Sequence, residues 1–403
     1  MSAAATQDIP AHVPPELVHN IGLTESPEFL KQPFDFMADL HNRLPPVFFS
    51  VGQGGAHKSW QLTKHSDVYF VLRHPEIFTT HGQGPFPRDP DNYFRIIPLE
   101  ISPPEHRKYR AIVDPLVSPQ AIAKLETNIR KLTNELIDKF IDRGECEFAK
   151  ELGRQLPVGV FLDIMGLPRS MMDEFVRWAM GLLHSQDRAA AGKIMGEVSA
   201  YLNSAIAEKT KNPDGGMVSA IVHGKPGGEP MSEREIFGFV FFVFIAGLDT
   251  VFAALNNMFV WLAENPERRR EIIANPGNIN NVIEELLRVF TVTFSGRVLA
   301  QDYELRGVQL KKGDRITSIL PTANFDPDVF PNPKEVNFHR PRTPTLSFAG
   351  GAHSCMGAHL ARLEIKIVVE EFLRRIPEFK LAQPIEYFPG AVIGPKAVHL
   401  SWK

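Results

Sequence analysis

Apolar residues recur every three to four positions through the middle of the chain, which is the spacing of one face of an α-helix. One such stripe consists of Leu125, Ile129, Leu132, Leu136 and Phe140. Similar spacing continues over residues 104–275. The most apolar run is 236–248, and the capping-box sequence SERE precedes it at 232–235. We therefore predict a helix over residues 232–263 that is about 48 Å long and crosses the whole molecule.

Strand-like patterns are confined to two regions. The runs 47–51 and 59–63 flank a glycine-containing turn segment, which predicts a β-hairpin. Residues 298–320 alternate between apolar and polar side chains and break at Gly307 and Gly313, which predicts short strands.

The remaining segments complete a mainly helical pattern. Residues 282–290 and 357–375 are predicted helices, and 78–104 is predicted to be a long irregular loop. The proline-punctuated residues 1–45 are expected to wrap the surface. Because neither a repeat nor a linker divides the chain, we expect one domain, 1–403, that is mainly α with a minor β region.

Composition narrows the class of protein. The 403 residues are 43% hydrophobic and 23% charged, as in globular proteins. The net charge is −3 and no long basic run occurs, which argues against nucleic-acid binding. The apolar run 236–248 is shorter than the about 20 residues of a bilayer span, so we interpret it as a buried core helix. Only two cysteines and no signal-peptide pattern favour a cytoplasmic protein.

A cysteine lies where a glycine-rich loop runs into a predicted helix. The segment 348–357 reads FAGGAHSCMG, with Cys355 near its end. Helix N-termini carry unpaired N–H groups and partial positive charge, which favour a thiolate, and a thiolate binds metal or attacks carbon. The alternative is that Cys355 is a buried structural cysteine. Its position between a glycine-rich loop and a helix favours a cysteine that binds metal or reacts.

Two polar motifs interrupt apolar helices. Asp249 and Thr250 follow the small residues Ala246 and Gly247, and Thr250 is expected to donate its hydroxyl to the Ala246 carbonyl and bend the helix. The resulting notch could hold a small ligand and water, unless Asp249 faces solvent. The pair Glu285 and Arg288 alone is equally typical of a solvated ion pair.

Together these motifs resemble the haem-thiolate monooxygenases, the cytochromes P450. The spacing of Phe348, Gly351, Cys355 and Gly357 is similar to the haem-binding loop of that family. Thr250 and Glu285 stand 105 and 70 residues before Cys355, as in the oxygen-groove and Glu-x-x-Arg signatures. Residues 324–333, NFDPDVFPNP, resemble the meander of the family. Segments resembling the bacterial camphor hydroxylase group are 12–18, 247–251, 284–288 and 307–314, so the likeness covers nearly the whole chain.

The resemblance implies a triangular, α-rich prism with a long central helix and a haem b (iron protoporphyrin IX) cofactor. It implies that Cys355 is the ligand of the haem iron. It assigns the haem propionates to His106, Arg110, Arg297 and His353. It makes Asp249 and Thr250 the acid–alcohol pair that supplies protons for dioxygen activation. It matches Glu285, Arg288 and Arg340 to a structural cluster that serves folding and haem retention.

The same resemblance suggests a substrate pocket, although a place in the plain core is the alternative for each residue. The expected pocket residues are Tyr93, Phe94, Phe242, Ile245, Ala246, Thr293, Phe294, Ala391 and Val392. Phe94 stands where the camphor hydroxylase group has a tyrosine that donates to a substrate ketone, and phenylalanine cannot donate unless Tyr93 takes over the role. Ser295 replaces an aspartate, and Phe294 adds a bulky ring. These departures favour another terpenoid or a norisoprenoid over camphor.

The resemblance also implies a partner and a reaction. Electrons would come from a two-iron ferredoxin with its NAD(P)H-dependent reductase, docked near Arg110, Arg342 and Arg362. The expected reaction is hydroxylation of a small lipophilic substrate with dioxygen. Peroxide-driven oxygenation and a haem or lipophile carrier are alternatives, and neither needs the Asp249–Thr250 pair. A thiol enzyme using Cys355 with His353 or His359 lacks a readable oxyanion arrangement.

Overall fold

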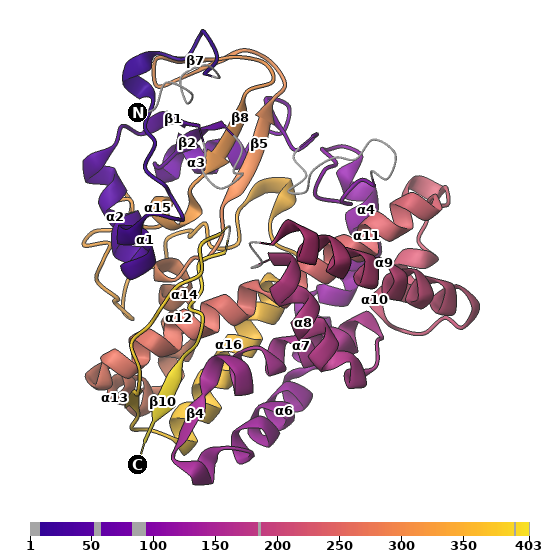
Figure 1. Ribbon diagram of the computed structural model, residues 1–403, viewed down its shortest axis with the longest axis vertical. Coiled ribbons are helices and arrows are strands. Elements are labelled where there is room, and N and C mark those ends of the chain that lie inside the picture. Colours follow the sequence, from indigo (N-terminus) through magenta and orange to yellow (C-terminus); the bar gives the residue numbers. More distant parts are fainter. Residues whose placement is uncertain (1–8, 52–57, 83–93, 184–186, 391, 403) are drawn as a thin grey trace.

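The computed structural model describes residues 9–51, 58–82, 94–183, 187–390 and 392–402. Helices fill most of the molecule, and the main sheet lies with the N-terminal helices at one end (Figure 1). This arrangement confirms the prediction of a mainly α fold with a minor β region.

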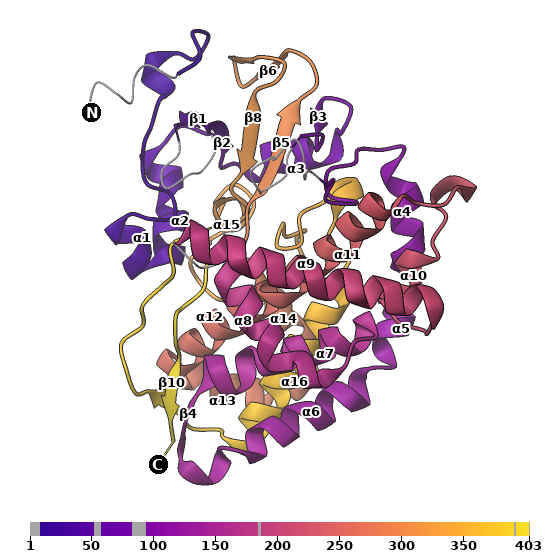
Figure 2. The ribbon, with the colours of Figure 1, turned by 45° about the vertical axis from the view of Figure 1, so that its right-hand side comes forward.

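Nine α-helices are described between residues 27 and 211. They are α1 (Pro27–Lys31), α2 (Pro33–Arg43), α3 (His65–Arg73), α4 (His106–Val113), α5 (Pro119–Ala123), α6 (Glu126–Asp138), α7 (Gln155–Met165), α8 (Met172–Leu183) and α9 (Arg188–Lys211). The later helices are α10 (Met217–Val222), α11 (Glu233–Leu248), α12 (Thr250–Glu264), α13 (Pro266–Ala274), α14 (Ile279–Val289), α15 (Leu320–Ala323) and α16 (Ala358–Arg375). Turned by 45°, the molecule shows α9 lying across α11 (Figure 2).

The strands form three small sheets. They are β1 (Val47–Ser50), β2 (Ser59–Leu62), β3 (Phe78–Thr79), β4 (Glu145–Glu147), β5 (Ser295–Leu299), β6 (Tyr303–Leu305), β7 (Val308–Leu310), β8 (Arg315–Ser318), β9 (Lys380–Leu381) and β10 (His399–Ser401). The predicted hairpin is confirmed, with Phe49 of β1 opposite Trp60 of β2. The five-stranded sheet has the order β1-β2-β8-β5-β3, and β5 pairs with β8 so that Arg297 lies opposite Ile316. Arg297 and Leu299 are both buried, because alternate residues of a strand share a face.

The long central helix has the predicted extent but is not continuous. Its capping box is present, since the Ser232 side chain accepts from the Glu235 N–H and the Glu235 carboxylate accepts from the Ser232 N–H. Asp249, with φ −117° and ψ −31°, separates α11 from α12. Glycine and aspartate are weak helix formers, which explains why the helix breaks here, directly after Gly247 and Leu248.

The stretch 233–264 is the one described helical segment with the length and hydropathy of a membrane span. It contacts α7, α8 and α9 through α11 and α16 through α12. Phe239, Phe241, Phe244 and Phe259 of this stretch are fully buried. Its position supports the interpretation as a core helix.

The proline-punctuated N-terminal segment contains two helices. Beyond the expected surface segment, the described part of this region contains α1 and α2, which occupy 27–43 and bury Phe29 and Phe36. Pro27 and Pro33 occupy first-turn positions, where a missing N–H costs nothing. The predicted loop 78–104 begins with β3, and much of it lies outside the described residues.

Candidate active site

The break between α11 and α12 faces a cavity of about 320 Å³ in the centre of the molecule. Its walls come from α4, α7, α11, α12, α16, the strand β5 and the loop before α16. Cys355, Thr250 and the propionate candidates His106, Arg110, Arg297 and His353 all line it. Segments spread over more than 240 residues of sequence are thus brought to one place.

The loop that carries Cys355 is held in a fixed shape. The Cys355 N–H donates to the Phe348 carbonyl at 3.0 Å, and the Arg110 guanidinium donates to the Ser354 carbonyl at 2.9 Å. Gly351 has a φ of +68°, and a Cβ there would lie 2.1 Å from the Leu72 carbonyl oxygen. Only glycine allows this approach, so the loop packs directly on α3.

The Cys355 thiol lines the cavity wall just before α16 begins. Burial raises the pKa of the Cys355 thiol, while the Gly357 N–H and the charges of Arg110 and Arg362 act in the opposite direction. A metal ion or another strong positive charge in the cavity would add to that opposing effect and favour the thiolate.

Cationic side chains gather on the same cavity with little compensating negative charge. Arg297 is 3% exposed, and its Nη2 has no hydrogen-bond partner in the part of the chain that the structure describes. Burial lowers the pKa of Arg297 to about 10. One of the arginines is paired with a carboxylate, because Arg110 Nε donates to Asp114 Oδ1 at 2.6 Å.

Two histidines complete this group. The rings of His106 and His353 lie 4.1 Å apart, and the buried Nδ1 of His106 has no partner among the described residues. Burial, with the charge of Arg110, lowers the pKa of His106 to about 4, and burial lowers that of His353 to about 2. An anion in the cavity would stabilise all these groups.

The notch in the long helix differs in one detail from the expectation. Thr250 lines the cavity, but its hydroxyl makes no hydrogen bond to Ala246 or to any other described residue. The expected bend through that bond was wrong, because α11 has already ended at Leu248. Asp249 is 2% exposed, which excludes the solvent-facing alternative. Ala246 and Gly247 line the cavity, and a Cβ on Gly247 would lie 2.4 Å from the Phe161 ring.

Some of the expected substrate-pocket residues line the cavity and others do not. Phe242, Ala246, Thr293 and Phe294 line the cavity. Ile245 does not, because at about 100° per residue it points well away from the face shared by 242, 243 and 246. Tyr93 and Ala391 lie outside the described residues.

Two further expected pocket residues, Phe94 and Val392, are not among the residues that line the cavity. Phe94 stacks edge-on against Phe237 and Phe241, with ring centroids 4.8 and 5.1 Å away, and does not line the cavity. Val392 packs against the main apolar core and is likewise absent from the wall. Aromatic packing on one face of α11 draws Phe94 away from the cavity.

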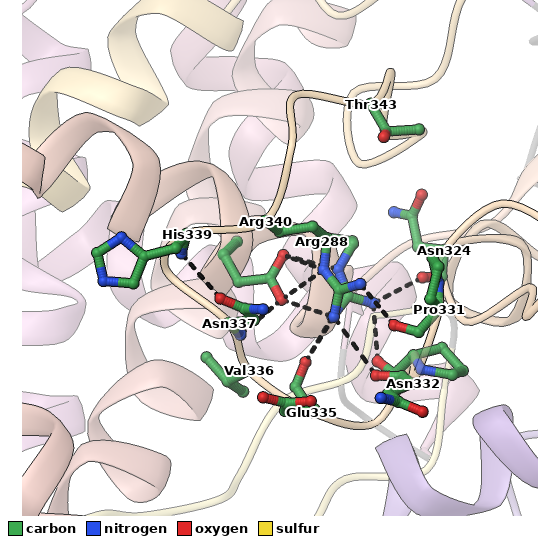
Figure 3. Close-up of polar contacts among 12 residues, drawn as sticks. Arg288, Asn324, Pro331, Asn332, Glu335, Val336, Asn337, His339, Arg340 and Thr343 are labelled. Carbon is green, nitrogen blue, oxygen red and sulfur yellow. Dashed lines mark hydrogen bonds and ion pairs between the residues drawn. The ribbon is translucent and has the colours of Figure 1, made fainter.

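Glu285 of α14 binds two arginines, Arg288 and Arg340, and both arginines are labelled in Figure 3. Its carboxylate accepts from Arg288 at 2.8 and 2.9 Å, from Arg340 at 3.0 Å and from the Asn337 N–H at 2.9 Å. Arg288 is fully buried and also donates to the carbonyls of Asn324, Pro333 and Glu335. Burial opposes the charge of Glu285, but the hydrogen bonds and charge of Arg288 outweigh it and lower its pKa.

The comparisons with known proteins agree with this geometry. Residues 278–387 match the family model described as cytochrome P450. A probable cytochrome P450 127A1 of Sinorhizobium fredii is 32% identical over 98% of this chain and 97% of its own length. The chain belongs to the cytochrome P450 family.

Other members of the cytochrome P450 family are also similar. The methyl-branched lipid omega-hydroxylase of Mycobacterium tuberculosis is 29% identical, over 87% of this chain and 85% of its own. The steroid C26-monooxygenase of Mycolicibacterium smegmatis is 27% identical, over 86% of this chain and 85% of its own length. The crystal structure of CYP101J2 superposes with a TM-score of 0.86 at 29% identity, covering 98% of this chain and 99% of that one. The fold is therefore that of the cytochromes P450.

Family membership implies a haem b cofactor, and the cavity of this P450 fits it. A thiol lies at one wall, and Arg297 Nη2 and His106 Nδ1, which are buried and lack a partner within the described ranges, are donors suited to carboxylates. When bound, haem with a thiolate ligand supplies the activation of dioxygen.

The structure also reveals cavity residues that the sequence did not suggest. Glu364 of α16 lies on the wall, is 2% exposed, and its burial raises its pKa well above the ordinary range. A glutamate on the apolar face of α16, between Ala361 and Val368, was the available signal. Phe161 and Met217 also line the cavity, and no local pattern marks them.

Replacing Glu285 by Gln should leave the buried Arg288 without an opposing charge and reduce the free energy of unfolding by about 3–5 kcal/mol. Because folding lowers the pKa of Glu285, its contribution is present above about pH 4.5 and is lost as the pH falls through its folded value. Denaturant unfolding of Glu285→Gln and wild type across pH 3–7 measures both effects.

The neighbouring variant Glu284→Gln is the matched control. Glu284 pairs with the half-exposed Arg362, so its loss should cost less than about 1 kcal/mol. Equal losses in the two variants would contradict the structural role of Glu285.

Proposed function

We propose that this P450 is a haem-thiolate monooxygenase in which Cys355 is the iron ligand. The observation that carries the proposal is the cavity lined by the Cys355 thiol, by the two arginines and two histidines His106, Arg110, Arg297 and His353, and by Thr250. Arg297 and His106 offer buried donors to the propionates, and Arg110 links that end of the site to the cysteine loop through the Ser354 carbonyl.

Asp249 and Thr250 are assigned to proton supply. Dioxygen reduction consumes protons, and a cavity enclosed by helices must deliver them through fixed groups. The Thr250 hydroxyl lines the cavity and is not bonded to the helix backbone, so it is free to donate to a group bound there. Asp249 is the adjacent buried carboxyl and can supply the proton that Thr250 passes on.

The substrate is proposed to be a small lipophilic molecule, a terpenoid or norisoprenoid rather than camphor. Phe242, Val243 and Phe294 present apolar surface to the cavity, which suits a hydrocarbon skeleton. Thr293 adds a hydroxyl to the same wall and could donate to a substrate carbonyl or alcohol. The lipid and steroid hydroxylases among its relatives also act on lipophilic molecules by name.

The electron donor is proposed to be a two-iron ferredoxin, with an NAD(P)H-dependent reductase, in the cytoplasm. An open surface groove of about 620 Å³ runs beside the cysteine loop between α14, α16 and residues 337–345, and Arg342 and Arg362 line it. Arg362 lies over the Phe348 ring at 4.5 Å, so this groove adjoins the loop of Cys355. Arg342 is exposed, which leaves its charge available to an acidic partner.

Thr250→Ala should divert electrons from product to hydrogen peroxide, because the last donor of the proton route is lost. We expect product per reducing equivalent to fall by at least about tenfold, since general acid–base catalysis typically contributes roughly 10²–10⁴-fold. The measurement is product and peroxide formed per NAD(P)H oxidised in a reconstituted system. Thr250→Ser keeps a hydroxyl and should remain coupled, whereas full coupling in Thr250→Ala would refute the assignment.

Arg342→Glu should slow reduction by the ferredoxin through charge repulsion, by about tenfold at low ionic strength and less as salt rises. Stopped-flow reduction at several salt concentrations measures this. Lys380→Glu, on β9 beyond the far end of α16, makes the same charge change and should have no effect. If both variants behave alike, the groove is not the docking site.

A further inference from the structure

The surface groove beside the cysteine loop carries more positive than negative charge at its solvent side. The exposed or half-buried cations on its walls include Arg342, Arg362 and Lys366. Among the residues that the structure describes there, Glu284 is the one carboxylate that reaches solvent, because Glu285 is buried. The whole chain has a net charge of −3, so the groove is a local region of the opposite sign. Such a region attracts acidic partners.

Glu284 already occupies one of these cations. Its carboxylate accepts from Arg362 Nε at 2.5 Å and from Arg362 Nη2 at 3.2 Å. Two parallel hydrogen bonds are the geometry in which a guanidinium recognises a carboxylate. Arg362 also stacks over the Phe348 ring at 4.5 Å, so a carboxylate that it holds lies close to the loop of Cys355. Glu284 therefore lies where a carboxylate of a docked protein would bind.

The pair of Glu284 and Arg362 is one that a partner can exchange. The two side chains are 40% and 35% exposed, and ion pairs at such positions contribute little to stability and are screened by salt. A carboxylate from outside can replace Glu284 at small cost. The neighbouring Glu285 cannot be replaced in this way, because it is buried and satisfies the fully buried Arg288.

The other two cations are less engaged than Arg362. Arg342 makes no hydrogen bond or ion pair with any described residue. Lys366 Nζ lies 3.9 Å from Glu370 Oε1, at the outer limit of an ion pair. Arg342 and Lys366 can therefore attract an acidic protein directly, whereas Arg362 contributes only after its own carboxylate has been displaced.

We propose that Glu284 is a built-in competitor of the electron donor, which a carboxylate of the ferredoxin displaces from Arg362 on docking. The inference rests on the proposed docking of a ferredoxin in this groove. Only ion pairs and hydrogen bonds are exchanged, and the Glu284 carboxylate is released to solvent. A two-iron ferredoxin carries one electron at a time, so a donor must dock and leave twice in each turnover. The competition weakens the complex, as suits a transient redox encounter.

Glu284→Gln should tighten the binding of the ferredoxin, because a neutral amide competes poorly for Arg362. We expect the Kd to fall by up to about fivefold at low salt, the range of an exposed ion pair, and by less as salt rises. Isothermal titration of the haem-loaded protein with the oxidised ferredoxin of the stopped-flow experiment measures this. Glu28→Gln is the matched control, since it removes the same charge from the exposed Glu28–Arg43 pair and should leave the Kd unchanged.

A double-mutant cycle separates competition from a general effect of charge. Arg362→Gln should weaken binding, and adding Glu284→Gln to Arg362→Gln should bring no gain, because the contested guanidinium is gone. If Glu284→Gln tightens binding equally with and without Arg362, its charge acts at a distance and the proposal is overturned.

Failure of this inference and failure of the proposed docking give different results. If Arg342→Glu slows reduction but Glu284→Gln binds like Glu28→Gln, docking in the groove holds and only the competitor role fails. If Arg342→Glu and Arg362→Gln both bind the ferredoxin like the wild type, the groove is not the docking site, and this inference fails with it.

Discussion

Buried polar groups must find partners, and in this P450 that constraint points to the cofactor. Arg297 Nη2 and His106 Nδ1, which have no partner among the described residues, share a cavity with the Cys355 thiol and with His353, and a buried unpartnered donor costs about 1–3 kcal/mol. Apolar packing cannot satisfy them. Haem has two carboxylates and an iron that binds thiolate, so haem bound in this cavity would supply partners for these groups and remove that cost.

A chain of hydrogen bonds connects the buried Glu285–Arg288 ion pair to the loop that carries Cys355. Arg288, paired with Glu285, donates to the Asn324 carbonyl, and the Asn324 side chain accepts from the Leu346 N–H at 2.8 Å and donates to Thr291 at 2.7 Å. Thr291 in turn donates to Ser347 at 3.0 Å. The residues just before the Phe348–Cys355 loop are therefore anchored to α14. This explains how a cluster outside the cavity fixes the position of the thiol.

The sequence predicted those features of the fold that depend on residues close together in the chain. The capping box at Ser232, the hairpin 47–63 and the helix after Gly357 were found because their patterns lie within a few residues. The break at Asp249 and the place of Ile245 were missed, since a periodic pattern says nothing of where a helix ends inside an apolar run. Phe161, Met217 and Glu364 were overlooked because tertiary packing of distant helices decides which side chains reach the cavity. Cys355, Thr250 and Arg297 were selected from motifs and from family resemblance, and only the folded chain shows that they line one cavity.

The absorption spectrum of the reduced protein under carbon monoxide tests the central claim most directly. The account predicts a strongly red-shifted haem band, which reports thiolate ligation, in the wild type and in Cys146→Ser, because Cys146 is buried in β4 away from the cavity. The band should be lost in Cys355→Ser. A band typical of histidine ligation in the wild type, or an unchanged red-shifted band in Cys355→Ser, would contradict the assignment of Cys355.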